Sequence, residues 1–197
     1  MKNLQDLLEQ IKLLEKELYE EIQKKQEEYY YIIRGKKVRF EKAARRQHKA
    51  LVTHIHTYLW HSKVRNIVSV PFIWACLPPA LFMDLVLSVF QAISFTLYRI
   101  PKVKRSEYII IDRHSLAYLN VIEKINCVYC GYFSGVIAYV QEIAARTEQY
   151  WCPIKHARRV GNIHSRYNKF MEYGDAKKYK EGLGKIRNDF KDLTNKN

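Results

Sequence analysis

Three of the four cysteines lie in one short stretch, and their spacing is typical of metal ligands. Cys127 and Cys130 form a C-x2-C pair, and Cys152 and His156 form a C-x3-H pair. Three thiolates and one imidazole can close a tetrahedral structural zinc site. The same ligand types can also hold an iron–sulfur cluster of the [2Fe–2S] kind. We therefore expect zinc or an iron–sulfur cluster if these residues meet.

The length of chain between the two pairs decides whether they can share an ion. Apolar residues recur at helical spacing between Cys130 and Cys152, and a helix over 133–150 would be about 27 Å long. Its two ends cannot hold one ion unless the helix breaks, for example at Gly135, or the C-x2-C pair folds back along it. The alternative for the C-x2-C pair is burial as small apolar side chains between helices. The sequence leaves both arrangements open.

A second group of reactive side chains depends on how two predicted helices pack. If helices 114–129 and 133–150 pack antiparallel about a turn at Gly131, acids, bases and thiols gather at one end of the pair. This group would include four candidate catalytic residues: Asp112, Arg113, His114 and Glu148. Such a set could form a hydrolytic or metal centre. The alternative is a set of ordinary ion pairs on helix surfaces.

The charge pattern points to a membrane surface. The chain has 34 Lys and Arg against 20 Asp and Glu, a net charge of +14, so an anionic partner is expected. Residues 67–98 contain Asp84 as their only charge, and basic residues flank them on both sides: Lys63, Arg65, Arg99, Lys102, Lys104 and Arg105. This arrangement favours anionic lipid over nucleic acid. The alternative is a buried helical hairpin in a soluble protein.

Two features of the apolar segment predict how it enters the membrane. Pro78 and Pro79 remove two backbone donors, so a helix must kink or break there. Basic flanks at both ends suit a segment whose two ends face the cytoplasm. We therefore favour a monotopic, re-entrant helical hairpin over a single kinked span, because the hairpin also keeps an acid away from the bilayer centre. The expected membrane-contacting residues are Trp74, Pro78, Pro79, Asp84, Arg99 and Lys102.

The remaining segments define a mainly helical chain with a small β element. The N-terminus has no apolar signal-peptide core, so the soluble parts should be cytoplasmic and their thiols reduced. Leucines at heptad spacing within 3–28 predict a helix that packs on its own chain, on a second copy or on another protein. We expect these segments: 1–28, an amphipathic helix; 29–40, a β-hairpin; 41–66, a basic amphipathic helix; 67–98, the membrane hairpin or span; 99–171, a helical domain with a short strand at 108–112 and the Cys/His motifs; and 172–197, a loosely held, Lys-rich tail.

Three motifs carry a resemblance to a known group of proteins. They are RIPKVKRSEYIIIDRH, LAYLNVIEKINCVYCGY and EIAARTEQYWCPIKHARRV. From about Pro71 to Val160 the chain resembles an uncharacterised family of bacterial membrane-associated proteins. The resemblance implies a bacterial source and membrane association, and it implies no activity or cofactor.

Together these patterns predict a protein of the bacterial inner membrane with its soluble parts in the cytoplasm. Three functions fit them. The first is a membrane-anchored metalloprotein, the second is an enzyme acting on lipid or a membrane-bound substrate, and the third is a scaffold that recruits a partner through its N-terminal helix.

Overall fold

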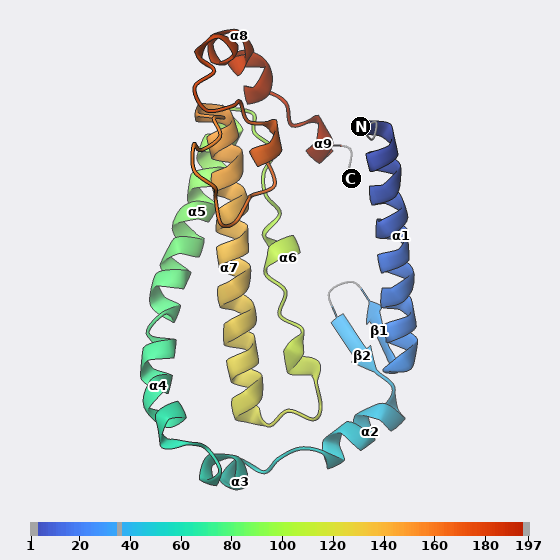
Figure 1. Cartoon of the computed structure of the whole chain (residues 1–197). Helices are drawn as coiled ribbons and strands as arrows, with labels where there is room; N and C mark the ends of the chain where they lie inside the picture. Colours follow the sequence, from blue (N-terminus) through green and yellow to red (C-terminus); the bar gives the residue numbers. More distant parts are fainter. Residues whose placement is uncertain (1–3, 35–36, 195–197) are drawn as a thin grey trace. The chain divides into compact units, whose positions relative to one another are not determined.

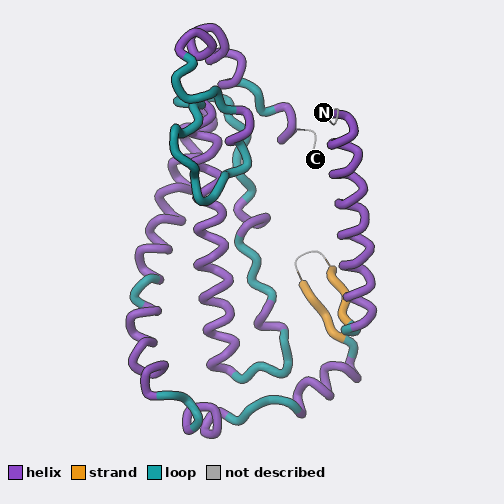
Figure 2. Tube along the Cα trace, viewed as in Figure 1, coloured by secondary structure: helices purple, strands orange, loops and turns teal. Residues whose placement is uncertain are grey.

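The protein is mainly helical. The computed structural model describes residues 4–34 and 37–194, and Figure 2 shows helices over most of them with one small two-stranded sheet. This confirms the predicted fold class at the level of a helical protein with a small β element. The chain divides into two compact units, Met1–Ser62 with Asp112–Val128, and Lys63–Ile111 with Tyr129–Asn197.

The first unit combines a long helix, a hairpin and several short helices (Figure 1). Its elements are α1 (Leu4–Glu28), β1 (Tyr31–Arg34), β2 (Lys37–Phe40), α2 (Lys42–Ala50), α3 (Ile55–Trp60), η1 (Arg113–Ser115) and the first turns of α7 (Val121–Trp151). The strands pair antiparallel with Tyr31 opposite Phe40, close to the predicted hairpin. The single helix predicted over 41–66 is wrong, because the chain leaves helical geometry between α2 and α3 and again after α3.

A capping box sets the start of α7. The side-chain oxygen of Asn120 accepts a hydrogen bond from the backbone N–H of Glu123, and the Glu123 carboxylate accepts one from the backbone N–H of Asn120, both at 2.9 Å. These bonds satisfy two donors that a helix N-terminus otherwise leaves without partners. The helix therefore begins at Val121, and not near residue 114 as predicted.

The second unit contains the apolar segment. Its elements are α4 (Val64–Trp74), α5 (Leu77–Leu97), α6 (Arg105–Tyr108), the rest of α7, η2 (Tyr167–Lys169), α8 (Ala176–Arg187) and α9 (Lys191–Thr194). In Figure 1, α4 and α5 follow one another end to end, and α5 runs beside α7.

Pro78 and Pro79 interrupt the apolar helix without reversing its direction. They occupy the first turn of α5, where a missing N–H removes no helical hydrogen bond. Ala75 and Cys76, between the helices, keep helical angles of φ −61°, ψ −19° and φ −76°, ψ −13°. The chain therefore continues in one direction, and the structure gives no support to the re-entrant hairpin predicted here.

Tyr129 packs against this interruption. Its hydroxyl donates a hydrogen bond of 2.7 Å to the carbonyl of Ile73. Its ring stacks on that of Trp74, with the centroids 5.0 Å apart. The ring and hydroxyl thus support the last turn of α4, where regular helical bonding ends.

The chain leaves α5 through a Schellman-type cap. Arg99 has a positive φ of 56°, and the backbone N–H of Ile100 donates to the carbonyl of Phe95 at 2.9 Å. In this motif the residue after the cap packs on the last turn of the helix. Ile100 and Phe95 are accordingly buried in one apolar cluster, together with Val103 and Tyr139.

α7 is one uninterrupted helix, so the predicted pair of helices with a turn at Gly131 is wrong. Gly131 and Gly135 lie one turn apart and leave room for a neighbouring backbone. A Cβ atom on Gly135 would lie 2.8 Å from the carbonyl oxygen of Tyr108 and from Cα of Ile109. Ile109 and Ile110 therefore lie along α7, and they have no partner strand among the described residues. The predicted strand at 108–112 is wrong for this reason.

The C-terminal segment packs on the end of α7. Buried Gln149 donates hydrogen bonds to the carbonyls of Ile186 and Asp189, each at 2.9 Å. Phe190 lies in the same apolar cluster as Phe95. Residues 176–194, expected to belong to a loose tail, thus form α8, α9 and part of the core.

A buried arginine holds α9 in place. Arg166 is 2% exposed and donates to Gln149 at 2.6 Å and to the carboxylate of Asp192 at 2.5 and 3.0 Å. The hydrogen bonds from Arg166, followed by those from Lys169, hold the pKa of the Asp192 carboxyl well below its usual range.

Candidate functional site: an apolar helix with a buried polar seam

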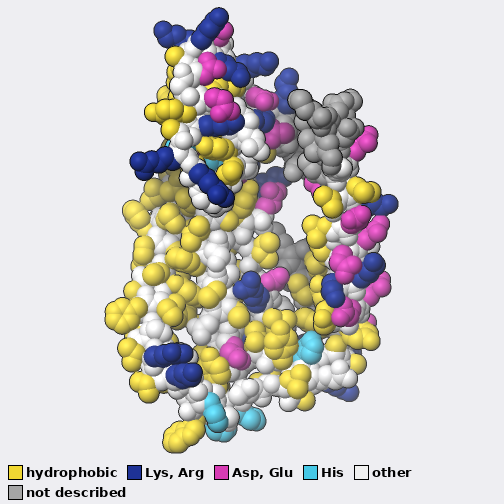
Figure 3. All heavy atoms as spheres, viewed as in Figure 1, with side chains coloured by type: hydrophobic (Ala, Val, Ile, Leu, Met, Phe, Trp, Pro, Cys, Tyr) yellow, Lys and Arg dark blue, Asp and Glu magenta, His cyan; other side chains and the backbone are white. Residues whose placement is uncertain are grey.

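The two sides of α5 have opposite character. Asp84, Ser88 and Gln91 recur every three or four residues and therefore share one face, which is turned toward the rest of the unit. The outer face carries seven exposed apolar side chains: Leu81, Phe82, Leu85, Val86, Val89, Ile93 and Leu97. Figure 3 shows apolar side chains gathered over α4 and α5. Polar residues inside and apolar residues outside are the reverse of the pattern on a helix that faces water.

We call the buried face of α5 with Asp84, Ser88 and Gln91, together with the side chains bonded to it, the polar seam. Asp84 is the centre of its first half. It is 7% exposed. Arg105 donates to both of its carboxylate oxygens, with Nε 3.0 Å from Oδ1 and Nη2 2.6 Å from Oδ2. The hydroxyl of Tyr132 on α7 donates to Oδ2 at 2.8 Å. The acid within the apolar segment is thus paired and hydrogen-bonded by its own chain, as a buried charge requires.

Gln91 connects α5 to the segment that follows it. Its side-chain oxygen accepts from the backbone N–H of Val103 at 3.0 Å, and its amide donates to the carbonyl of Val103 at 3.3 Å. The amide also donates to the hydroxyl of buried Tyr139. One side chain therefore satisfies the backbone of a non-helical residue, which fixes the position of Val103 beside α5.

We call residues 99–108 the basic strap. Ile100 and Val103 of the strap are buried, whereas Lys102 and Lys104 are exposed. Arg105 reaches Asp84 with a side chain that is itself half-exposed. Lys104 pairs with Glu107 at 3.7 Å, and both side chains are 60% exposed. The strap therefore presents charge on one side of α5, and the exposed apolar side chains lie on another.

A buried ion pair continues the seam along α7. Arg146 Nε donates to Glu142 at 2.8 Å, and both side chains are 8% exposed. Arg146 also donates to the carbonyl of Pro101 at 2.7 Å, and the hydroxyl of Ser165 donates to Glu142 at 2.6 Å. Because each charge has further hydrogen bonds, the pair joins the strap, α7 and the C-terminal segment.

The candidate metal ligands do not come together. Cys127 and Cys130 lie one turn apart on α7, and Cys152 follows the end of the same helix, about 33 Å from Cys130 at 1.5 Å per residue. Among residues 4–34 and 37–194, no three His, Cys, Asp or Glu side chains are placed to hold a metal ion. His156 stacks on the ring of Tyr167 instead, with the centroids 6.3 Å apart.

The four candidate catalytic residues fall in different units. Asp112, Arg113 and His114 belong to the first unit, and Glu148 belongs to the second. Glu148 lies 3.1 Å from Nε2 of His164. The turn at Gly131 that was to gather the four residues does not exist, so the geometry gives no reason to assign them one reaction.

The expected membrane-contacting residues have several different surroundings. Asp84 is buried in the polar seam. The others are partly or fully exposed along α4, α5 and the strap: Trp74, Pro78, Pro79, Arg99 and Lys102.

Sequence reasoning missed the polar partners of Asp84. The available signal was the spacing of Asp84, Ser88 and Gln91 on one side of an otherwise apolar helix. Tyr132 and Tyr139 on α7 carry the complementary signal, because they are seven residues apart and so lie on one face.

The comparisons with known proteins yield no relatives. No family model matches the chain, and no curated protein and no solved structure is significantly similar to it. The resemblance to bacterial membrane-associated proteins therefore has no support from them. What can be said of function rests on the residues and their geometry.

Proposed function

We propose that this is a monotopic membrane protein, held at the surface of a bilayer by the outer face of α4 and α5. One observation supports the proposal above all. Val64–Leu97 covers 34 residues and is long and apolar enough to cross a membrane, yet only 11% of its most apolar window is buried by the protein. A bilayer would cover this apolar surface, which water covers at a cost of about 25 cal/mol per Å².

The basic strap favours attachment to one leaflet over a complete crossing. Asp84 lies about 11 Å from the start of α5 and about 20 Å from its end, at 1.5 Å per residue. Arg105 is bonded to Asp84, so the exposed Lys104 and Glu107 lie near this level. In a span they would enter the hydrocarbon, where a charged side chain costs about 2.5–3.5 kcal/mol near the centre.

We infer that the strap faces water while the outer face of α5 enters the lipid. Basic residues on the strap then lie where they can reach anionic headgroups: Arg99, Lys102 and Lys104. Each contributes about 1 kcal/mol near an anionic surface. Basic residues on both sides of the apolar segment favour the cytoplasmic leaflet.

Sided cysteine labelling tests this proposal. Single-cysteine variants Ser62→Cys and Ser106→Cys would be made in a chain without its four native cysteines and expressed in bacterial membranes. An impermeant maleimide should label both positions from the same, cytoplasmic, side. Labelling from opposite sides would show that the segment crosses the bilayer and would refute monotopic attachment.

A chain retaining only Cys76 provides the control. Cys76 is exposed in the structure, so the protein itself does not shield it. In membranes it should resist the maleimide until detergent is added. Equal labelling of Cys76 with and without detergent, together with release of the protein by alkaline carbonate, would refute membrane insertion.

A further inference from the structure

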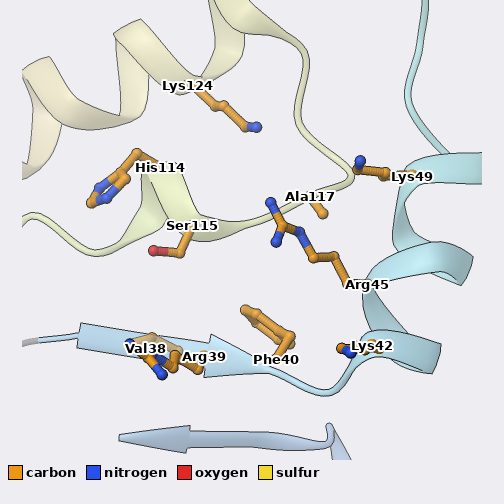
Figure 4. A pocket seen from close by; sticks show the side chains of 10 residues that line it. All are labelled: Val38, Arg39, Phe40, Lys42, Arg45, Lys49, His114, Ser115, Ala117 and Lys124. Carbon is orange, nitrogen blue, oxygen red and sulfur yellow. The ribbon is translucent and has the colours of Figure 1, made fainter. Parts of the chain in front are cut away.

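A cleft in the first unit is lined by cations that come from different parts of the chain. It has a volume of about 610 Å³, within the usual range for small-molecule sites, and lies between β2, α2, η1 and the start of α7 (Figure 4). Five lysine and arginine residues line it, together with one histidine and no acid: Arg39, Lys42, Arg45, Lys49, Lys124 and His114.

Local structure turns these cations toward one space. Lys42, Arg45 and Lys49 are three and four residues apart and therefore form one stripe along α2. Ala44 is buried beside that stripe, and the ring of His48 packs edge-on against Phe40 at 5.3 Å and Tyr118 at 5.4 Å. This packing orients α2. Figure 4 shows Arg45 extending from α2 and Lys124 from α7 toward the same cleft.

The cleft cations have no acidic partner among the described residues, unlike several arginines of the second unit. In the second unit, Arg105, Arg146 and Arg166 each pair with a carboxylate. No ion pair joins an acid to any of the five cleft cations within the described part of the chain. Like charges at helical spacing repel one another, so this arrangement is favourable only when an anion is close.

We propose that this cleft binds clustered phosphoryl groups. Arginine can bind two phosphate oxygens at once, and lysine adds positive charge without that fixed geometry. The cleft is far larger than one phosphate needs, and its floor includes apolar atoms of Val38, Phe40 and Ala117. A ligand with several phosphoryl groups, or with a phosphate beside an apolar part, matches this lining. The source is a soluble polyphosphate or a lipid headgroup.

Calorimetry on the full chain in nanodiscs of zwitterionic lipid tests the proposal. Tripolyphosphate represents the soluble source, and nanodiscs that contain phosphatidic acid represent the lipid source. We expect one of two results. Either tripolyphosphate binds to the protein held in zwitterionic discs, or the protein moves from zwitterionic discs to discs that contain phosphatidic acid. No binding and no preference would overturn the proposal.

Two matched triple variants separate the cleft from general charge. Lys42→Gln, Arg45→Gln and Lys49→Gln together should weaken the observed binding at least tenfold. The control neutralises three exposed lysines on α8: Lys177, Lys178 and Lys185. It removes the same charge and should change binding less than twofold. Equal losses in the two variants would mean that the charge of the whole chain, and not the cleft, attracts the anion.

Two single variants keep the test independent of folding. Lys124→Gln, on a different element, should weaken binding about threefold or more. Arg45→Lys keeps the charge but loses the two-point contact, so it should lie between the unaltered chain and the triple variant. Tighter binding of an oligonucleotide that the cleft variants leave unchanged would refute a phosphate cleft and favour a nucleic-acid surface elsewhere.

Discussion

Replacing Gly135 by alanine tests how the strap and α7 are held together. The added Cβ would lie 2.8 Å from the carbonyl oxygen of Tyr108 and from Cα of Ile109. Both are backbone atoms, so no side-chain rotation relieves the contact. The segment must retreat to about 3.4 Å, the lower limit of an ordinary contact. Because Tyr108 ends the strap, this movement strains the bonds that the strap makes to α5.

The expected magnitude follows from two opposing effects. Overpacking of this kind costs about 1–3 kcal/mol, and alanine gains about 1 kcal/mol over glycine in a helix. The net loss of stability should therefore be at most about 2 kcal/mol. For a chain of this size, a loss of about 2 kcal/mol lowers Tm by about 4–8 °C.

Thermal unfolding in mild detergent, followed by circular dichroism, measures this change. Gly184→Ala is the matched control, because Gly184 is also helical but has no atom within 4 Å of an added Cβ. It should raise Tm slightly through helix propensity alone. If Gly135→Ala raised Tm as much as the control, the close approach of the strap to α7 would be refuted.

Three further predictions concern other contacts. Asp84→Asn should destabilise the chain by about 1–3 kcal/mol, and a double-mutant cycle with Arg105→Gln should show coupling; additive changes in Tm would contradict this bond. The lowered pKa of Asp192 means that its stabilising effect is complete above about pH 4 and is lost as pH falls further toward the folded-state pKa. An acid titration by circular dichroism should therefore show Asp192→Asn less stable than the unaltered chain at pH 6, with the difference shrinking between pH 4 and pH 2; a difference that stays constant over this range would contradict the prediction. Elemental analysis should show that Cys130→Ala and Cys152→Ala do not both lower the amount of metal bound to the protein. An equal loss of metal in the two variants would show that both cysteines belong to one site.

The elements with regular local patterns could be predicted from the sequence. The heptad leucines gave the N-terminal helix, and the aromatic and β-branched residues on both sides of Gly35 gave the hairpin. The apolar segment was equally clear from its composition. These patterns depend on neighbouring residues, so one sequence is enough to find them.

Features that depend on contacts between distant residues could not be predicted in the same way. Gly131 was expected to end a helix, but in the structure it leaves space for the backbone near Ile110. Tyr108 and the isoleucines after it were expected to form a strand, yet they lie in the space beside Gly135. The α7 capping box at Asn120 and Glu123 was a readable local signal that was missed.

The candidate site was predicted only in outline. Asp84 was identified as an expensive acid, but its partner Arg105 lies 21 residues away, and Tyr132 lies 48 residues away. Spacing along one helix could show which face of α5 is polar. It could not show which later segments cover that face.

The polar seam also imposes an order on synthesis. Gln91 bonds to Tyr139, which lies 48 residues later in the chain. A ribosome adds about 5–20 residues per second, so this partner is made about 2–10 s after Gln91. During that interval the nascent α5 carries its buried acid and amide without their partners from α7. In the membrane attachment proposed above, α5 therefore reaches its final position in lipid only after α7 has been made.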